Sequence, residues 1–291
     1  MKGKFEPEEI RSWLCGPIIA AATPFTEEFA LDLDALQEHV RFMIGHGVTT
    51  GQGALLMAAA GGEHPTMNVD ERKAVMTAAV EAAAGEVPVL TSIQHTDVRV
   101  IVELAQHAAR AGIQAVQLNA TYYYPATEGD VLRLFKMVAD AADVSIMIYR
   151  VGVLKQMGID FLQRLAELET VRVVKFGSIE QGEFDRGVRT LGKDLVVIDN
   201  SGQHVWGHML GTRGIITHIG SFWPEYVVEI WQLLERGEYA AVRDKLIAFK
   251  WQWADWVEKV ASFTGGEGPF TKAAMETVGL RAGPPRPPSV R

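Results

Sequence analysis

The chain has 291 residues, of which 48% are hydrophobic and 22% are charged, and its formal net charge is −8. This composition can supply a large core, either one α/β barrel or two smaller domains, and the negative charge argues against non-specific nucleic-acid binding. Met1–Trp13 lacks a signal-peptide core, no apolar run reaches the roughly 18 residues of a membrane span, and the single Cys15 cannot form an internal disulfide, so we expect a cytoplasmic protein.

Short apolar or β-branched runs recur along the chain and predict strands. They lie near Pro17–Ala22, Gly53–Met57, Val87–Ser92, Gln114–Asn119, Val144–Tyr149, Val171–Lys175, Leu195–Asp199 and Gly214–Thr217. Longer amphipathic stretches between them predict helices, among them Leu33–Gly45, Asp70–Ala84, Asp97–Ala111 and Asp130–Ala141.

Eight strands that alternate with helices, nearly all of them apolar throughout, predict a parallel sheet closed as a (β/α)8 TIM barrel. The rival is an open, doubly wound sheet. No G-x-G-x-x-G follows the first strand and no P-loop motif occurs, which disfavours that rival.

The alternation stops near residue 235. We therefore expect residues 1–235 to form the barrel with the active site, and residues 236–291 to form a C-terminal helical extension. Tyr239–Val260 is predicted as one helix and Thr271–Val278 as a second, short one. Tryptophans in the first of these helices predict packing within the extension or at a subunit interface.

Catalytic groups of such barrels project from the carboxyl ends of the strands. Lys175 ends the apolar run Val171–Val174, and a buried amine that gives up its proton is a nucleophile suited to imine formation with a carbonyl. The alternative is a lysine whose stem packs while its head reaches solvent. Tyr149 ends the preceding strand and could relay protons beside the lysine, as could one hydroxyl of Tyr122–Tyr124.

Several motifs in this order resemble the dihydrodipicolinate synthase and N-acetylneuraminate lyase family. Ala22-Thr23-Pro24-Phe25 is similar to its T-P-F segment, and Gly62 to Arg72 fits G-E-x-x-x-L-x-x-x-E-R without a gap. Tyr122-Tyr123 with Glu128-Gly129 resembles P-Y-Y…E-G. Ile148-Tyr149, Val174-Lys175, Thr271 to Leu280 and Arg286-Pro287-Pro288 resemble its Y-N-x-P tyrosine, its I-K lysine, and its C-terminal helix and tail.

The resemblance implies a class I aldolase or dehydratase that binds a 2-oxo acid without a cofactor. It makes Lys175 the imine lysine and Tyr149 the proton relay, and it makes Tyr123 the tyrosine supplied across a subunit interface. A homo-oligomer, either a dimer or a tetramer, is implied with them. No Cys/His cluster or paired-carboxylate motif suggests a metal, and an imine mechanism needs none.

Two departures from the family bear on the substrate. Ala59-Ala60-Gly61-Gly62-Glu63 stands where the family has G-T-T-G-E, so backbone N–H groups near Ala60, Gly61 and Gly62 would have to hold the substrate carboxylate. Tyr149 is followed by Arg150 instead of the family's Y-N-V-P-S-R, so Arg150 becomes a candidate ligand of a sugar-acid carboxylate or hydroxyl, with a surface salt bridge as the alternative. Asn200 and Ile216 complete the set of candidate substrate-binding residues.

We therefore expect a Schiff-base-forming lyase that cleaves or dehydrates a 3-deoxy-2-oxo sugar acid or a related 4-hydroxy-2-oxo acid. One alternative is a dihydrodipicolinate synthase-type condensation of pyruvate, although the missing family arginine disfavours it. Another is a ligand-binding barrel that has lost turnover, which the altered Ala59–Gly62 loop motivates. A metal-dependent class II aldolase lacks ligands.

Overall fold

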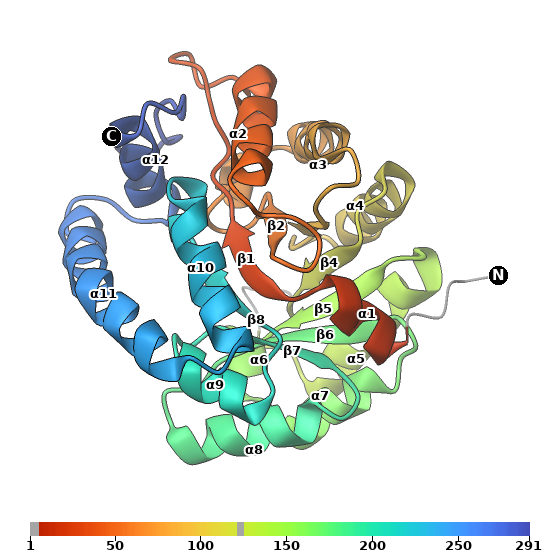
Figure 1. Ribbon diagram of the computed structural model, residues 1–291. Coiled ribbons are helices and arrows are strands. Elements are labelled where there is room, and N and C mark those ends of the chain that lie inside the picture. Colours follow the sequence, from red (N-terminus) through yellow and green to blue (C-terminus); the bar gives the residue numbers. More distant parts are fainter. Residues whose placement is uncertain (1–5, 121–124) are drawn as a thin grey trace. The chain divides into compact units, whose positions relative to one another are not determined.

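The computed structural model describes residues 6–120 and 125–291. Eight parallel strands pair in chain order and close into a barrel, with helices in between (Figure 1). The strands are β1 (Gly16–Ala20), β2 (Ala54–Met57), β3 (Val89–Ser92), β4 (Ala115–Leu118), β5 (Ser145–Tyr149), β6 (Val171–Phe176), β7 (Val196–Asp199) and β8 (Gly214–Thr217). The predicted (β/α)8 fold is confirmed.

Helices that precede, separate and follow the strands complete the fold. They are α1 (Pro7–Trp13), α2 (Leu33–Gly45), α3 (Val69–Ala83), α4 (Val98–Ala111), α5 (Glu128–Ala141), α6 (Val153–Gln156), α7 (Ile159–Ala166), α8 (Gln181–Leu191), α9 (His204–Leu210), α10 (Pro224–Glu235), α11 (Tyr239–Ala261) and α12 (Gly268–Thr277), with short 3₁₀ turns η1 (His64–Thr66) and η2 (Ile219–Ser221). The four helices predicted before residue 145 are present within a few residues of their predicted bounds.

Local capping explains where several helices begin and end. The side chain of Asn68 accepts a hydrogen bond from the backbone N–H of Glu71, and the Glu71 carboxylate accepts one from the backbone N–H of Asn68, which forms a capping box ahead of α3. Helix α4 begins after the capping residue Asp97 and ends at Gly112, whose φ of 90° suits a residue without a side chain. These signals are local in the sequence, which is why the bounds could be predicted.

Two bounds differ from the prediction for identifiable reasons. Helix α12 begins at Gly268 rather than at Thr271, because Pro269 fits the first turn of a helix, where no N–H donor is needed. Strand β1 ends at Ala20, two residues earlier than predicted, and the apolar run continues as a loop as far as Ala22.

Unit 1 of the fold consists of Leu90–Ile216 with the N-terminal segment as far as Cys15. It holds strands β4 to β7 and most of β3 and β8, paired in parallel register. The strands are buried on both faces, as expected for a parallel barrel whose outer face is covered by helices. Helix α8 packs against β6 and β7 and contacts its neighbours α7 and α9.

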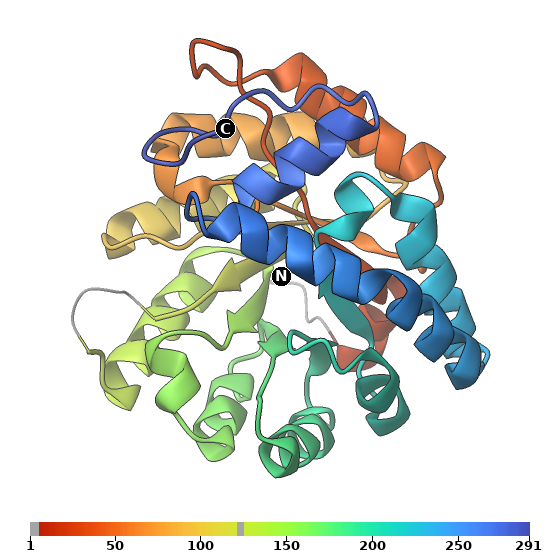
Figure 2. The same cartoon turned by 90° about the vertical axis from the view of Figure 1, so that its left-hand side faces the viewer.

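Unit 2 consists of Gly16–Val89 and Thr217–Arg291. Here α10 packs on β1 and on the 3₁₀ turn η2, and the long helix α11 contacts both α10 and α12 (Figure 2). The predicted boundary near residue 235 stays a prediction. Helices α11 and α12 do follow it in the chain, and within this unit α11 contacts α10 while α12 contacts η2.

A run of aromatic rings joins the C-terminal helices within unit 2. Trp253 of α11 lies 5.1 Å from Phe222, 6.4 Å from Phe249 and 5.7 Å from Phe270, measured between ring centroids. The indole N–H of Trp256 points to the carbonyl of Phe270 at 3.4 Å. Both tryptophans are therefore packing residues, in agreement with the prediction, whereas Trp251 is 65% exposed.

Candidate active site

Lys175 and Tyr149 lie side by side at the carboxyl ends of β6 and β5. The parallel register pairs Tyr149 directly with Lys175, and residues paired in this way point to the same face of the sheet. The Nζ atom of Lys175 lies 4.1 Å from the centroid of the Tyr149 ring, and Lys175 as a whole is only 6% exposed. The structure thus brings together the two residues predicted to carry the chemistry.

The neighbouring residue Phe176 shows which face this is. Its ring packs against α8, 6.3 Å from the ring of Phe184, and a Cβ atom added at Gly187 would lie 2.2 Å from its Cζ atom. Phe176 therefore points outward to the helices, so Lys175 points into the barrel. Val173 and Met147, one layer deeper on the same face, are fully buried apolar residues beneath the amine.

Arg150, predicted as a ligand of the substrate carboxylate, is held inside the protein by a carboxylate of its own. Its guanidinium lies 2.6 Å from Oε1 of Glu183 and donates to the carbonyls of Gly177 and Lys155 at 3.2 and 3.1 Å. It also stacks over the ring of Phe176 at 4.9 Å. The buried Nε–H has no hydrogen-bond acceptor among the described residues, so binding to a substrate carboxylate would use this donor or require the Glu183 pair to open.

Glu183, in the first turn of α8, was not anticipated from the sequence. Its second oxygen accepts a hydrogen bond from Oγ of Ser178 at 2.6 Å. The Ser178 hydroxyl holds the pKa of Glu183 below its usual value and Arg150 adds to this effect, although burial works in the opposite direction. The carboxylate is therefore ionised at neutral pH and balances the charge of Arg150.

The carboxyl end of β7 carries a second polar cluster. The buried carboxylate of Asp199 accepts hydrogen bonds from the backbone N–H and the hydroxyl of Ser201, and it pairs with Nδ1 of His204 at 3.0 Å. Burial alone would raise the pKa of Asp199, but His204 and Ser201 outweigh it and hold the pKa below its ordinary value. His204 was not named from the sequence, because nothing in its spacing points to Asp199.

The predicted ligands Asn200 and Ile216 lie at the ends of β7 and β8. The side chain of Asn200 is exposed, while its backbone N–H donates to the carbonyl of Phe176 at 2.8 Å. The chain at Asn200 passes so close to Gly177 that a Cβ atom there would lie 3.0 Å from the Asn200 carbonyl, so a side chain at Gly177 would force one of the two backbone segments to shift. Ile216 is half-buried in β8.

The loop that carries Ala60, Gly61 and Gly62 follows β2 in unit 2. A Cβ atom at Gly61 would lie 2.8 Å from the carbonyl oxygen of Ala20 and 2.9 Å from the ring of His218, so glycine is required there for packing. The hydroxyl of Thr23 donates to the carbonyl of Gly62 at 2.8 Å. The two glycines expected to hold an anion thus lie in a loop whose backbone position is fixed.

Glu63, the next residue, anchors the same loop to the C-terminal segment. Its left-handed backbone conformation, with a φ of 56°, turns the chain into η1. Its carboxylate lies 2.7 Å from Nζ of Lys272 and accepts a hydrogen bond from the backbone N–H of Arg286 at 2.9 Å. Arg286 in turn pairs with Glu71 in the first turn of α3. Nothing in the spacing of these residues along the chain predicts the long-range pairs.

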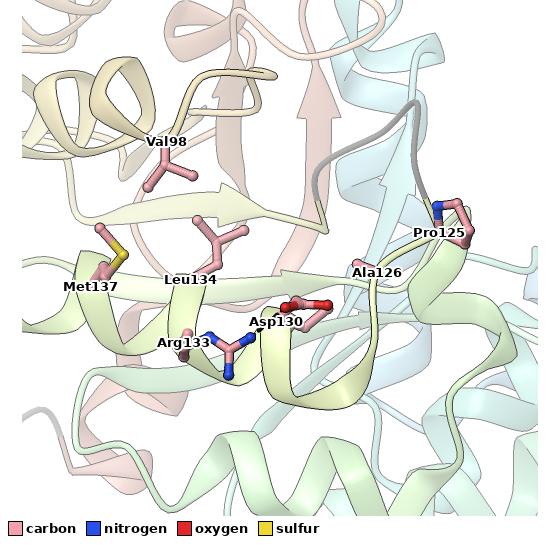
Figure 3. Close-up of a pocket in the computed structure, with 8 residues that line it drawn as sticks. Val98, Pro125, Ala126, Asp130, Arg133, Leu134 and Met137 are labelled. Atoms are coloured by element: carbon pink, nitrogen blue, oxygen red, sulfur yellow. Dashed lines mark hydrogen bonds and ion pairs between the residues drawn. The ribbon is translucent and has the colours of Figure 1, made fainter.

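Tyr123 lies outside the described residues. A cavity of about 380 Å³ opens between α4 and α5 (Figure 3). It is lined mainly by Val98, Pro125, Ala126, Val131, Leu134 and Met137, together with Asp130 and Arg133, which pair with each other. Neither Lys175 nor Tyr149 lines it, so it is not the site predicted from the sequence.

Comparison with known proteins identifies the chain. Residues 14–291 match the Dihydrodipicolinate synthetase family. The chain belongs to this family. A 4-hydroxy-tetrahydrodipicolinate synthase of Rhodopseudomonas palustris is 29% identical over 238 residues, which are 80% of this chain and 79% of that protein. An uncharacterized DapA-like lyase of Halobacterium salinarum is 26% identical over 277 residues, covering 94% of this chain and 88% of that protein.

Solved structures related to the dihydrodipicolinate synthetase family share the fold. N-acetylneuraminate lyase from Mycoplasma synoviae superposes with a TM-score of 0.83 at 24% identity, over 96% of this chain and 92% of that one. Dihydrodipicolinate synthase from Aquifex aeolicus gives a TM-score of 0.82, also at 24% identity, over 94% of this chain and 92% of that one. At this identity the superpositions show only that the chains share the barrel fold.

Membership of the dihydrodipicolinate synthetase family makes the chain a class I, Schiff-base-forming lyase, as predicted, and the family acts on small 2-oxo acids such as pyruvate. No helix in the described part of the chain is long and apolar enough to cross a membrane. Within residues 6–120 and 125–291, no three His, Cys, Asp or Glu side chains are grouped so that they could hold a metal ion.

Proposed function

We propose that the chain cleaves or dehydrates a 3-deoxy-2-oxo sugar acid, or a related 4-hydroxy-2-oxo acid, through an imine on Lys175. The observation that carries the proposal is the position of the Lys175 amine. It is buried inside the barrel, above apolar residues and 4.1 Å from the ring of Tyr149. Burial disfavours the charged form of an amine, and the neutral form is the one that attacks a carbonyl.

The first half of the reaction forms the imine. Nζ of Lys175 attacks C2 of the 2-oxo acid, and the resulting carbinolamine loses its hydroxyl as water. We assign Tyr149 to this step, because a phenol at the same strand level can give a proton to the departing hydroxyl and take one from the amine. Once the imine is protonated, the face of the Tyr149 ring stabilises its positive charge.

The protonated imine then accepts the electron pair that the substrate releases. In cleavage, the C4 hydroxyl loses its proton, the C3–C4 bond breaks and an aldehyde leaves; the enamine is protonated at C3 and hydrolysed to pyruvate. In dehydration, the C3 proton is removed, the enamine expels the C4 hydroxyl, which takes up a proton and leaves as water, and hydrolysis of the unsaturated imine frees Lys175 and the product. Both routes use Lys175 and Tyr149 and need no cofactor.

We assign the remaining predicted residues to binding. The backbone N–H groups around Ala60, Gly61 and Gly62 would hold the substrate carboxylate, a task that glycine-rich loops perform without hydroxyl side chains. The exposed amide of Asn200 suits a hydroxyl-rich substrate, and Ile216 would flank the substrate at the end of β8. We further propose that the chain forms a dimer or tetramer in which Tyr123 serves the site of a neighbouring subunit. Light scattering of the purified protein would measure the number of subunits.

A condensation of pyruvate with an aldehyde is the second candidate, and the 29% identity to a 4-hydroxy-tetrahydrodipicolinate synthase favours it. It uses the same imine in the opposite direction, since aldol cleavage is reversible. Loss of pyruvate in the presence of an aldehyde, with no cleavage of any 2-oxo sugar acid, would make condensation the function of the chain.

Trapping with borohydride tests the proposal. Wild-type protein is incubated with pyruvate and with a panel of longer 2-oxo acids, reduced, and analysed by intact mass and peptide mapping. We expect an adduct on the peptide that contains Lys175 and none in Lys175→Ala. The control is Lys193→Ala, which removes an exposed lysine after α8 and should leave the adduct unchanged. If the folded wild-type protein gives no adduct with any acid, the barrel is a ligand-binding relative without turnover.

A further inference from the structure

In unit 1, the segments that follow β5 and β6 are joined by a hydrogen-bonded network of Arg150, Glu183 and Ser178, which we call the polar brace. Arg150 comes directly after Tyr149, and its backbone N–H donates to the carbonyl of Lys175 at 3.3 Å. Its guanidinium reaches across to the carbonyl of Gly177 at 3.2 Å and covers the ring of Phe176. The side chain of Arg150, which directly follows β5, therefore contacts Phe176 and Gly177, the two residues that follow Lys175.

Glu183 closes the brace from α8. Its Oε1 atom lies 2.6 Å from Nη2 of Arg150, and its Oε2 atom lies 2.6 Å from the hydroxyl of Ser178, three residues after Lys175. The same hydroxyl accepts a hydrogen bond from the backbone N–H of Glu180 at 3.1 Å, ahead of α8. The position of helix α8 is thereby tied to the ends of both strands.

The chemistry of the Arg150–Glu183 contact indicates that it fixes the geometry of the strand ends rather than adding stability. The Arg150 side chain is 2% exposed and the Glu183 side chain is 31% exposed, so the arginine is fully desolvated and its partner is not. Desolvation of the arginine offsets much of the attraction, so the pair contributes little net stability. What an apolar pair cannot do is fix two backbone segments by directed hydrogen bonds. The planar fork of arginine does so with three acceptors at once.

We propose that Arg150, Glu183 and Ser178 are positioning residues that hold the Lys175 amine against Tyr149 for imine formation. This inference rests on the proposed function, because it concerns the orientation of the imine-forming lysine. It gives Arg150 a role that differs from the binding of a substrate carboxylate, since here the carboxylate partner is Glu183.

The rate of borohydride-trapped adduct formation with pyruvate, measured against pyruvate concentration, tests the brace. Ser178→Ala removes one hydroxyl, and Arg150→Lys keeps the charge but cannot reach three acceptors. We expect the maximal trapping rate to fall on the order of 10-fold to 100-fold in Arg150→Lys and by a smaller factor in Ser178→Ala, with little change in the pyruvate concentration at half-maximal rate. A carboxylate-binding role for Arg150 would instead raise that concentration.

Two further variants keep the test decisive. The double variant Arg150→Met/Glu183→Leu leaves neither charge of the pair without its partner, so we expect it to fold even where a single substitution does not. Its trapping rate should be as low as that of Arg150→Lys or lower. The matched control is Arg172→Lys on β6, whose guanidinium donates to the carbonyls of Ala166 and Leu168 near the start of the strand. Wild-type trapping rates in the folded double variant would overturn the brace, whereas absence of any adduct in the wild type would overturn the proposed function itself.

Discussion

Glu63 and Lys272 form an ion pair that is almost completely removed from solvent. Oε1 of Glu63 and Nζ of Lys272 lie 2.7 Å apart, and their side chains are 7% and 2% exposed. Lys272 also donates to the carbonyl of Pro284 at 3.0 Å and lies 4.1 Å from the ring centroid of Phe25. Burial lowers the pKa of Lys272, and the charge of Glu63 opposes that shift. The pair fixes the loop after β2 onto α12 and the segment that follows it.

Replacing one member of this pair should be costly. Lys272→Met leaves the Glu63 carboxylate buried beside an apolar side chain, and we expect a loss of about 3 to 5 kcal/mol in the free energy of unfolding. Denaturation by urea measures this value. The exposed Lys250→Met is the matched control and should change the stability by less than about 0.5 kcal/mol. Equal stability of the two variants would show that the pair contributes nothing.

Stability should fall in mild acid because of His39. This histidine of α2 is 2% exposed, its Nε2 lies 2.8 Å from the carbonyl oxygen of Ser221, and burial lowers its pKa from 6.5 to about 4. Between these two values the unfolded chain binds a proton that the folded chain does not, so stability present above pH 6.5 is lost as the pH falls toward 4. The expected loss is on the order of 3 kcal/mol. Unfolding curves of wild type and His39→Gln across this range should diverge; parallel curves would contradict the prediction.

Gly187 should tolerate no side chain. A Cβ atom there would lie 2.2 Å from Cζ of Phe176, so Gly187→Ala forces α8 away from β6 or forces Phe176 to turn. We expect a destabilisation of about 1 to 3 kcal/mol and slower adduct formation at the adjacent Lys175. Gly129→Ala in α5 is the control, since its new methyl group would meet nothing closer than 3.5 Å. Thermal melts of both variants measure the destabilisation, and borohydride trapping measures the rate of adduct formation.

Removing the Tyr149 hydroxyl should slow imine formation while the ring stays beside the Lys175 amine. In Tyr149→Phe the ring still lies beside the Lys175 amine, but no phenol is left to move protons. We expect the rate of imine formation with pyruvate to fall by about 10²-fold to 10⁴-fold, with the fold intact. Single-turnover trapping gives the rate. If Tyr149→Phe reacts as fast as the wild type, the relay lies elsewhere.

The barrel and its central lysine could be predicted because their signals are local. An apolar run that ends in a lysine or tyrosine gives both a strand and a residue at its carboxyl end, and β5 and β6 lie within two residues of their predicted bounds. Helices α1 and α6 were missed because one or two turns are too short to show a helical period.

The partners of the polar side chains could not be predicted. Arg150 was named from the sequence, but Glu183 lies 33 residues away, and only the packing of α8 on β6 brings the two together. Glu63 and Lys272 likewise meet through the fold and not through any spacing. Sequence patterns indicate which side chains end a strand, whereas the charges that neutralise them come from elements whose placement the pattern does not specify.

The contact between Glu63 and Arg286 joins residues that are 223 positions apart. During synthesis the ribosome adds all the intervening residues before the Arg286 backbone can reach the Glu63 carboxylate, and Lys272 also arrives late. Until then the Glu63 carboxylate has neither of these two partners and stays in contact with water. The loop that we propose to hold the substrate carboxylate, although encoded early, therefore gains its contacts with the C-terminal segment only when that segment has been synthesised.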